Sequence, residues 1–90
     1  MTKFFDTLTA ILNTLDVIYT SSTKTNQFDI TVCENSEDIK EAELLYDFLA
    51  YHSDLGGETC TNYSNALGYG TKFYFVVDGV KINWEWKSVE

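Results

Sequence analysis

The dipeptide Asp78-Gly79, set between two alternating hydrophobic runs, is the feature that most constrains the fold of this chain. A two-residue type I′ turn needs positive φ at both central positions, and Asp-Gly is one of the pairs that favour it. Counting outward from this turn gives two sets of facing residues. One face pairs Val77 with Val80, Phe75 with Ile82 and Phe73 with Trp84, and the other pairs Lys72 with Glu85, Tyr74 with Asn83 and Val76 with Lys81. Turn chemistry and hydrophobic alternation therefore predict the same hairpin register.

A helix and two strands are expected before residue 34. The helix should run from about Thr2, a plausible N-cap, to Leu15, because apolar residues recur on one helical face. That face comprises Phe4, Leu8, Ile11 and Leu15, and Phe5 and Leu12 widen it. Residues 17–23 are rich in β-branched and aromatic types, which favour a strand. In residues 28–33 apolar and polar side chains alternate, which predicts a half-buried strand.

A second helix is expected from a cap at Asn35 or Ser36 to Tyr51 or His52. Its main apolar stripe consists of Ile39, Ala42, Leu45, Tyr46 and Leu49. A second stripe, formed by Leu44, Phe48 and Tyr51, is rotated from the first by more than about 100°. A helix that is apolar on two sides must bury both, so we expect the second stripe to meet the first helix or a second copy of the chain.

Residues 53–70 resemble a loop, and either a short strand lies near residues 59–63 or the loop is functional. The expected order is then α-β-β-α-β-β. This order predicts a single α+β domain over residues 1–90, a two-layer sandwich with an antiparallel sheet and two helices on one face.

The negative charge is concentrated in the middle of the chain. The formal net charge is −8, and the six basic residues are all lysines. Nine of the fourteen acidic residues fall between residues 29 and 58, where Lys40 is the only lysine. They are Asp29, Glu34, Glu37, Asp38, Glu41, Glu43, Asp47, Asp54 and Glu58. Without arginine, direct nucleic-acid binding is disfavoured, whereas a concentrated negative charge attracts a basic partner. A merely solvated acidic face is the alternative.

No motif for catalysis or metal binding stands out. His52, Asp54 and Cys60 could form a thiol site, and Cys33, His52 and Cys60 could contribute to a zinc site, but neither set has a characteristic spacing. We therefore expect no enzyme activity, no metal and no cofactor. With no export signal and no membrane-spanning stretch, we expect a cytoplasmic protein whose two cysteines are reduced.

In size, acidity and lack of arginine, and in the carboxylates along one helix, the chain resembles the small phage-encoded inhibitors that mimic DNA, of the anti-restriction and anti-CRISPR type. The resemblance implies binding to a basic DNA-binding protein in the host cytoplasm, in competition with DNA. A helix of 17 residues would span about 25 Å, and a homodimer through Leu44, Phe48 and Tyr51 would double that length. An immunity protein that neutralises a basic toxin, such as a nuclease, is the alternative.

Overall fold

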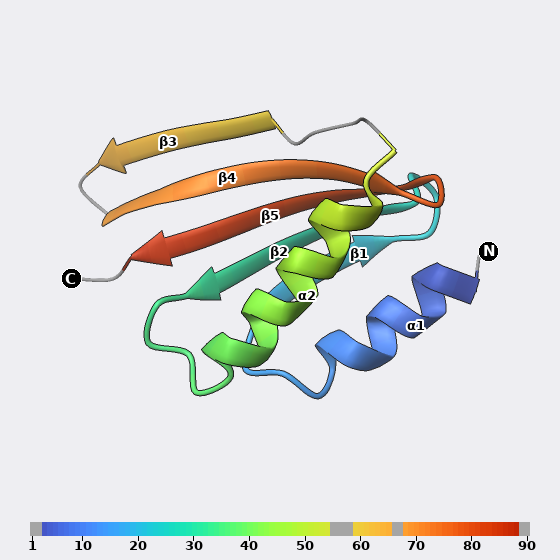
Figure 1. Ribbon diagram of the computed structural model, residues 1–90, viewed down its shortest axis with the longest axis horizontal. Helices are drawn as coiled ribbons and strands as arrows, with labels where there is room; N and C mark the ends of the chain where they lie inside the picture. Colours follow the sequence, from blue (N-terminus) through green and yellow to red (C-terminus); the bar gives the residue numbers. More distant parts are fainter. Residues whose placement is uncertain (1–2, 55–58, 66–67, 89–90) are drawn as a thin grey trace.

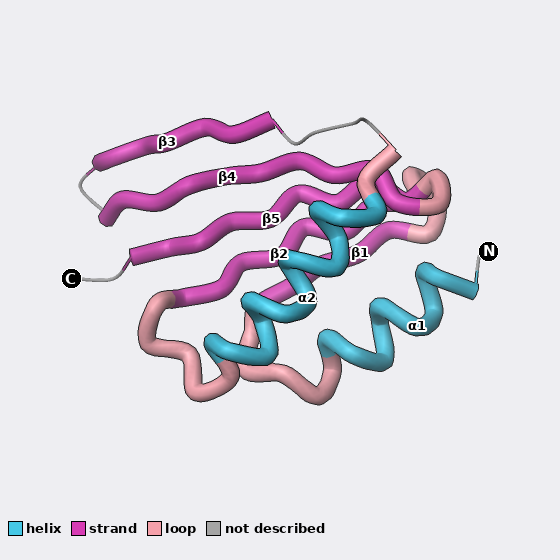
Figure 2. The backbone as a smooth tube through the Cα atoms, in the orientation of Figure 1, coloured by secondary structure: helices cyan, strands magenta, loops and turns pink. Residues whose placement is uncertain are grey.

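In the computed structural model the chain forms two layers, with helices α1 (Lys3–Leu12) and α2 (Ile39–His52) on one face of a five-stranded sheet (Figures 1 and 2). The structure describes residues 3–54, 59–65 and 68–88, with the backbone alone over 59–65 and 68–69. The strands are β1 (Ile18–Ser22), β2 (Gln27–Cys33), β3 (Thr59–Asn65), β4 (Gly68–Val77) and β5 (Val80–Ser88). The predicted α+β class and the arrangement of both helices on one face are confirmed.

The sheet is mixed, which corrects the antiparallel sheet expected from the sequence. The strand order is β1-β2-β5-β4-β3, and the central β2–β5 pair is parallel, with Ile30 opposite Trp84. The other three pairs are antiparallel. The cause is β3, which follows the crossover helix α2 and so runs parallel to β2. Two antiparallel steps from β3, through β4, then leave β5 parallel to β2.

The hairpin at Asp78-Gly79 has the predicted register. Val77 faces Val80, Phe73 faces Trp84, and the intervening pairs follow the same count. Asp78 has φ of 52° and Gly79 has φ of 77°, as a type I′ turn requires. The strand considered near residues 59–63 is confirmed as well and extends to Asn65, where it pairs with Gly68.

Both helices are shorter than predicted. α1 ends at Leu12 rather than Leu15, because the backbone tightens there: the N–H of Thr14 donates to the carbonyl of Ile11, 3.0 Å away. α2 begins at Ile39 with Asp38 at the N-cap position, so the predicted caps at Asn35 and Ser36 were wrong. The hydroxyl of Ser36 instead donates to the backbone carbonyl of Asp16, at 2.6 Å.

The core lies between the helices and the sheet. α1 contributes Phe5, Leu8 and Leu12, all of which lie on the predicted face, whereas Ile11 from the same face is 39% exposed. The ring of Phe5 packs 4.5 Å from that of Phe28 on β2. The remaining buried apolar residues are Ile30, Val32, Ala42, Leu45, Leu49, Phe75, Val77, Val80, Ile82 and Trp84. Over the described residues, neither helix has the length and apolar character needed to cross a bilayer.

Candidate partner-binding surface

Helix α2 has one buried face and one exposed apolar face. Ala42 and Leu49 are fully buried against the sheet, and the ring of Tyr46 packs edge-on against Phe73 and Phe75 of β4, at 5.0 and 5.4 Å. The outer face carries Leu44, Phe48 and Tyr51, which we call the apolar strip. These side chains are 70%, 48% and 85% exposed. α1 therefore does not cover the second stripe of the helix.

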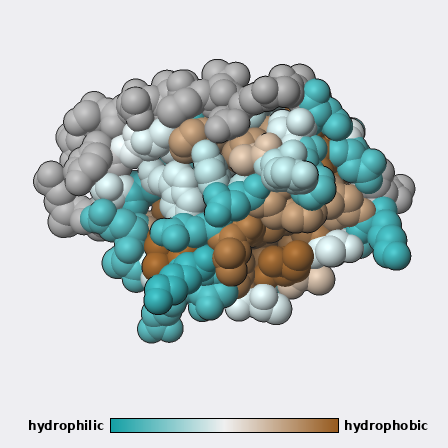
Figure 3. Space-filling view, viewed as in Figure 1, coloured by the Kyte–Doolittle hydropathy of each residue, from teal (hydrophilic) through white to brown (hydrophobic). Residues whose placement is uncertain are grey.

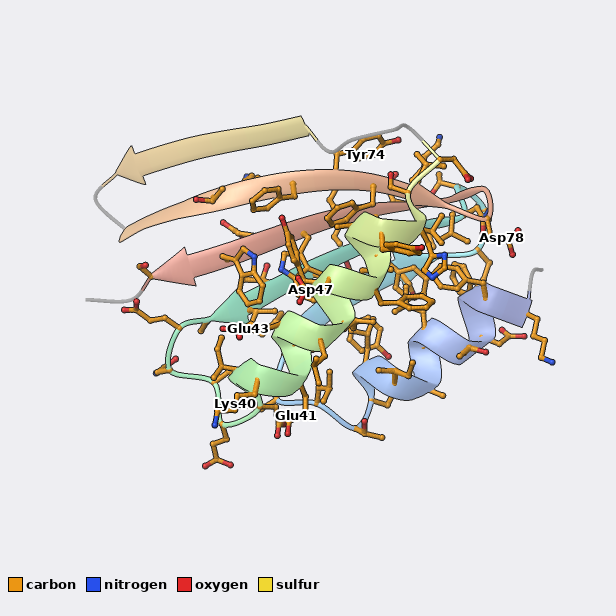
Figure 4. All side chains as sticks on the ribbon, in the orientation of Figure 1. Lys40, Glu41, Glu43, Asp47, Tyr74 and Asp78 are labelled. Carbon is orange, nitrogen blue, oxygen red and sulfur yellow. The ribbon has the colours of Figure 1, made fainter. Side chains whose placement is uncertain are left out.

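Carboxylates border the apolar strip on both sides. At about 100° per residue, Glu43 and Asp47 project on the side of α2 that carries Tyr46, toward β4 and β5. Glu41 projects on the opposite side, toward α1, and Figure 4 shows the same division. All three residues are exposed. We call Glu41 on one side, and Glu43 with Asp47 on the other, the acidic flanks.

Figure 3 views the molecule from the helix side, where a hydrophobic area over the two helices is bordered by hydrophilic side chains. At the C-terminal end of α2, His52 adds to this area. Its ring lies 4.4 Å from that of Phe48 and 4.9 Å from that of Tyr51. The three rings thus support one another at the surface.

The turn before α2 holds three more of the predicted acidic residues, and each takes part in a hydrogen bond. The carboxylate of Asp38 accepts a hydrogen bond of 2.6 Å from the backbone N–H of Asp16. The backbone N–H of Glu37 donates to the carboxylate of Asp16, at 3.2 Å, and the side chain of Glu37 is exposed. The backbone N–H of Glu34 donates to the carbonyl of Lys87, 2.9 Å away, and anchors the turn to β5.

Asp29 lies on the other side of the molecule. It alternates with the buried Phe28 and Ile30 and therefore projects from the sheet face that the helices leave open. Its carboxylate accepts a hydrogen bond of 2.8 Å from the amide of Asn83. Around this pair is a hollow of about 360 Å³, whose lining includes Thr31, Lys72, Phe73 and Glu85. The hydroxyl of Thr31 donates to Glu85 there, at 3.1 Å.

The nine acidic residues therefore do not form one continuous ridge. Glu37, Glu41, Glu43 and Asp47 share the helix side of the molecule and are exposed there. Asp54 follows the far end of α2, where its backbone N–H donates to the carbonyl of Val76, at 2.7 Å. Glu58 lies outside the described residues. With 14 residues, α2 spans about 21 Å rather than the expected 25 Å.

The structure does not assemble the alternative chemical sites among the residues it describes. His52 packs on aromatic rings at the surface, and Asp54 is exposed. Cys33 is a free, half-buried thiol at the end of β2, whereas the side chain of Cys60 lies outside the described part of the chain. Over the described residues, no group of three or more His, Cys, Asp or Glu side chains is placed to hold a metal ion.

Comparisons with known proteins do not add to this description. A scan against protein-family models, a search of curated proteins and a search of solved structures each gave no match. The functional argument therefore depends on the surface of α2.

Proposed function

We propose that this chain is a non-enzymatic inhibitor that mimics DNA and occupies the basic DNA-binding surface of a host protein in the cytoplasm. The observation that carries the proposal is the set of exposed carboxylates of Glu37, Glu41, Glu43 and Asp47, on and just before one helix, with Lys40 as the only lysine between residues 29 and 58. A surface of this kind attracts lysine and arginine side chains that otherwise contact phosphates.

The spacing of the charges supports the proposal. Along the axis of α2, the backbone positions of Glu41, Glu43 and Asp47 fall within about 9 Å, with rises of about 3 Å and 6 Å between successive residues. The phosphates of one DNA strand are about 3.4 Å apart along the duplex axis. The helix is rigidly held, because Tyr46 and the buried leucines fix its inner face to the sheet. The backbone positions that carry the carboxylates are therefore fixed relative to one another.

The proposal is tested with purified DNA-binding proteins: a restriction enzyme, a CRISPR effector, a DNA-repair enzyme and a nucleoid protein. We expect at least one to bind, with an affinity that falls steeply as salt is raised, and to be released by duplex DNA. The double variant Glu43→Gln, Asp47→Asn should weaken this binding at least tenfold. Its matched control, Asp6→Asn with Asp78→Asn, removes the same charge elsewhere and should change binding less than threefold. Equal effects of the two variants would contradict the proposal.

The apolar strip favours a second candidate, an immunity protein that neutralises a basic toxin. Exposed aromatic side chains are typical of the centres of protein–protein interfaces, whereas contacts to phosphates are mainly polar. Competition separates the two functions. A DNA mimic is displaced by duplex DNA, whereas an immunity protein bound away from the nucleic-acid site of its toxin is not.

A further inference from the structure

We propose that the apolar strip is the centre of the contact with the basic partner and inserts into an apolar pocket that lysine or arginine side chains surround. This inference rests on the proposed function and specifies its partner. It replaces the homodimer that the sequence alone suggests for Leu44, Phe48 and Tyr51.

The exposure of the strip indicates that it binds something. Its three residues follow one another at spacings of four and three along α2 and form a single row on the outer face. They are the most exposed large hydrophobic side chains on this helix, at 48% or more. An apolar row of this size with a polar border is characteristic of an interaction surface.

The strip is also preorganised. The ring of His52 lies against Phe48 on one side and meets Tyr51 edge-on, at an interplanar angle of 78°. Side chains that already pack together lose less conformational freedom on binding. Such aromatic side chains commonly provide the strongest contacts of an interface.

Charge decides between a second copy and a basic partner. In a two-fold dimer, each side of the strip meets a side of the strip on the other copy. Because Glu41 lies on one side and Glu43 with Asp47 on the other, carboxylates face carboxylates in either orientation of the two helices. Lys40 alone would oppose this repulsion, and each copy carries a net charge of −8. Against a basic partner, the same acidic flanks meet cations.

The available area leads to the same conclusion. Two partly exposed aromatic rings and one leucine offer on the order of 400 Å², about half of the roughly 800 Å² that each partner buries in a stable interface. The acidic flanks must therefore supply the remaining contact. They can do so favourably only when the opposite surface is positive.

The experiment compares three variants for binding to whichever purified DNA-binding protein is bound by the wild-type chain. The strip variant is Leu44→Gln with Phe48→Gln, its control is Ile18→Gln, and the charge variant is Glu43→Gln with Asp47→Asn. Ile18 is a suitable control because it is 66% exposed on the open face of the sheet, away from α2. Circular dichroism verifies that each variant is folded, and sedimentation velocity gives the oligomeric state.

We expect the strip variant to bind at least tenfold more weakly at low and at high salt, with an unchanged salt dependence. The charge variant should bind more weakly at low salt and lose part of its salt dependence. The control should bind like the wild-type chain, which should sediment as a monomer. Unchanged binding by the strip variant would overturn the inference but leave the proposed function intact. The same holds if the wild-type chain sediments as a dimer and the strip variant as a monomer. Absence of any binding protein overturns both.

Discussion

Asp16 and Asp38 join the two loops that lead into β1 and α2. The backbone N–H of Asp16 donates to the carboxylate of Asp38 across 2.6 Å, and the carboxylate of Asp16 accepts from the backbone N–H of Glu37. Ser36 completes the junction, since its hydroxyl donates to the carbonyl of Asp16 and accepts from the N–H of Asp38. This junction fixes where α2 begins and therefore where its exposed carboxylates lie.

Replacement of Asp38 should accordingly weaken the fold. We expect Asp38→Ala to lower the free energy of unfolding by about 1–2 kcal/mol, because a charge-assisted hydrogen bond is lost at the N-terminus of a helix. Urea denaturation followed by tryptophan fluorescence measures the change. Glu37→Ala removes an exposed acidic side chain from the same turn, keeps the backbone N–H that bonds to Asp16, and serves as the control. A loss no larger than that of the control would show that the junction does not stabilise the fold.

The sequence predicts those elements in which local chemistry and periodicity agree. The register of the last hairpin follows from Asp78-Gly79 because one turn type fits the hydrophobic alternation. The second apolar stripe of α2 follows from helical spacing alone, whereas its exposure beside α1 does not. The position of Asp29 can also be predicted from the sequence. Its alternation with Phe28 places it on the polar face of β2, opposite to the apolar face that the helices cover.

Two features could not be read from local patterns. β3, with the sequence Thr-Cys-Thr-Asn-Tyr-Ser-Asn, has no apolar alternation, and its pairing with β4 is a tertiary property. If β3 is left out, β4 follows the crossover helix directly, and β5 is then expected to run antiparallel to β2. The start of α2 was missed because Ser36 forms its hydrogen bonds with a loop twenty residues away in the sequence.

The turn at Gly79 gives a test of backbone strain. Its φ of 77° lies in the left-handed region, whereas a Cβ at this position would meet nothing closer than the amide nitrogen of Asn26, at 4.0 Å. Gly79→Ala should therefore destabilise the fold by about 1–2 kcal/mol through conformation alone. Asp78→Asn is the matched substitution, because asparagine tolerates positive φ, and it should leave the urea midpoint nearly unchanged. Equal urea midpoints for the two variants would show that backbone strain at residue 79 does not lower the stability.

The aromatic cluster around Tyr46 should hold α2 on the sheet. Its ring meets four others edge-on or tilted, and the farthest is that of Trp84, at 5.9 Å. We expect Tyr46→Leu to cost about 1–3 kcal/mol, since each such aromatic pair contributes roughly 0.5–1.5 kcal/mol. Tyr46→Phe keeps the ring contacts and should therefore be more stable than Tyr46→Leu. Chemical denaturation measures both variants, and a similar loss in the two would assign the effect to the hydroxyl rather than to the ring contacts.

Asp47 offers a test of whether the acidic flanks lower the stability of the chain. One helical turn before it lies Glu43, whose like charge on the same side of α2 is unfavourable. Glu37 and Glu41 do not form a second pair of this kind, because Glu37 precedes the helix. Asp47 therefore belongs to the one acidic i,i+4 pair that lies within α2.

We expect Asp47→Asn to stabilise the fold by about 0.3–0.5 kcal/mol at low ionic strength, and the gain to shrink as salt screens the repulsion. Asp6→Asn is the matched control and should lower the stability. Asp6 lies in the first turn of α1, where the helix dipole favours an anion. Thermal unfolding at low and high salt measures both. A variant that is more stable and yet binds the basic partner more weakly is the combination expected when carboxylates are kept for binding at a cost in stability. Destabilisation by Asp47→Asn would mean that this carboxylate supports the helix instead.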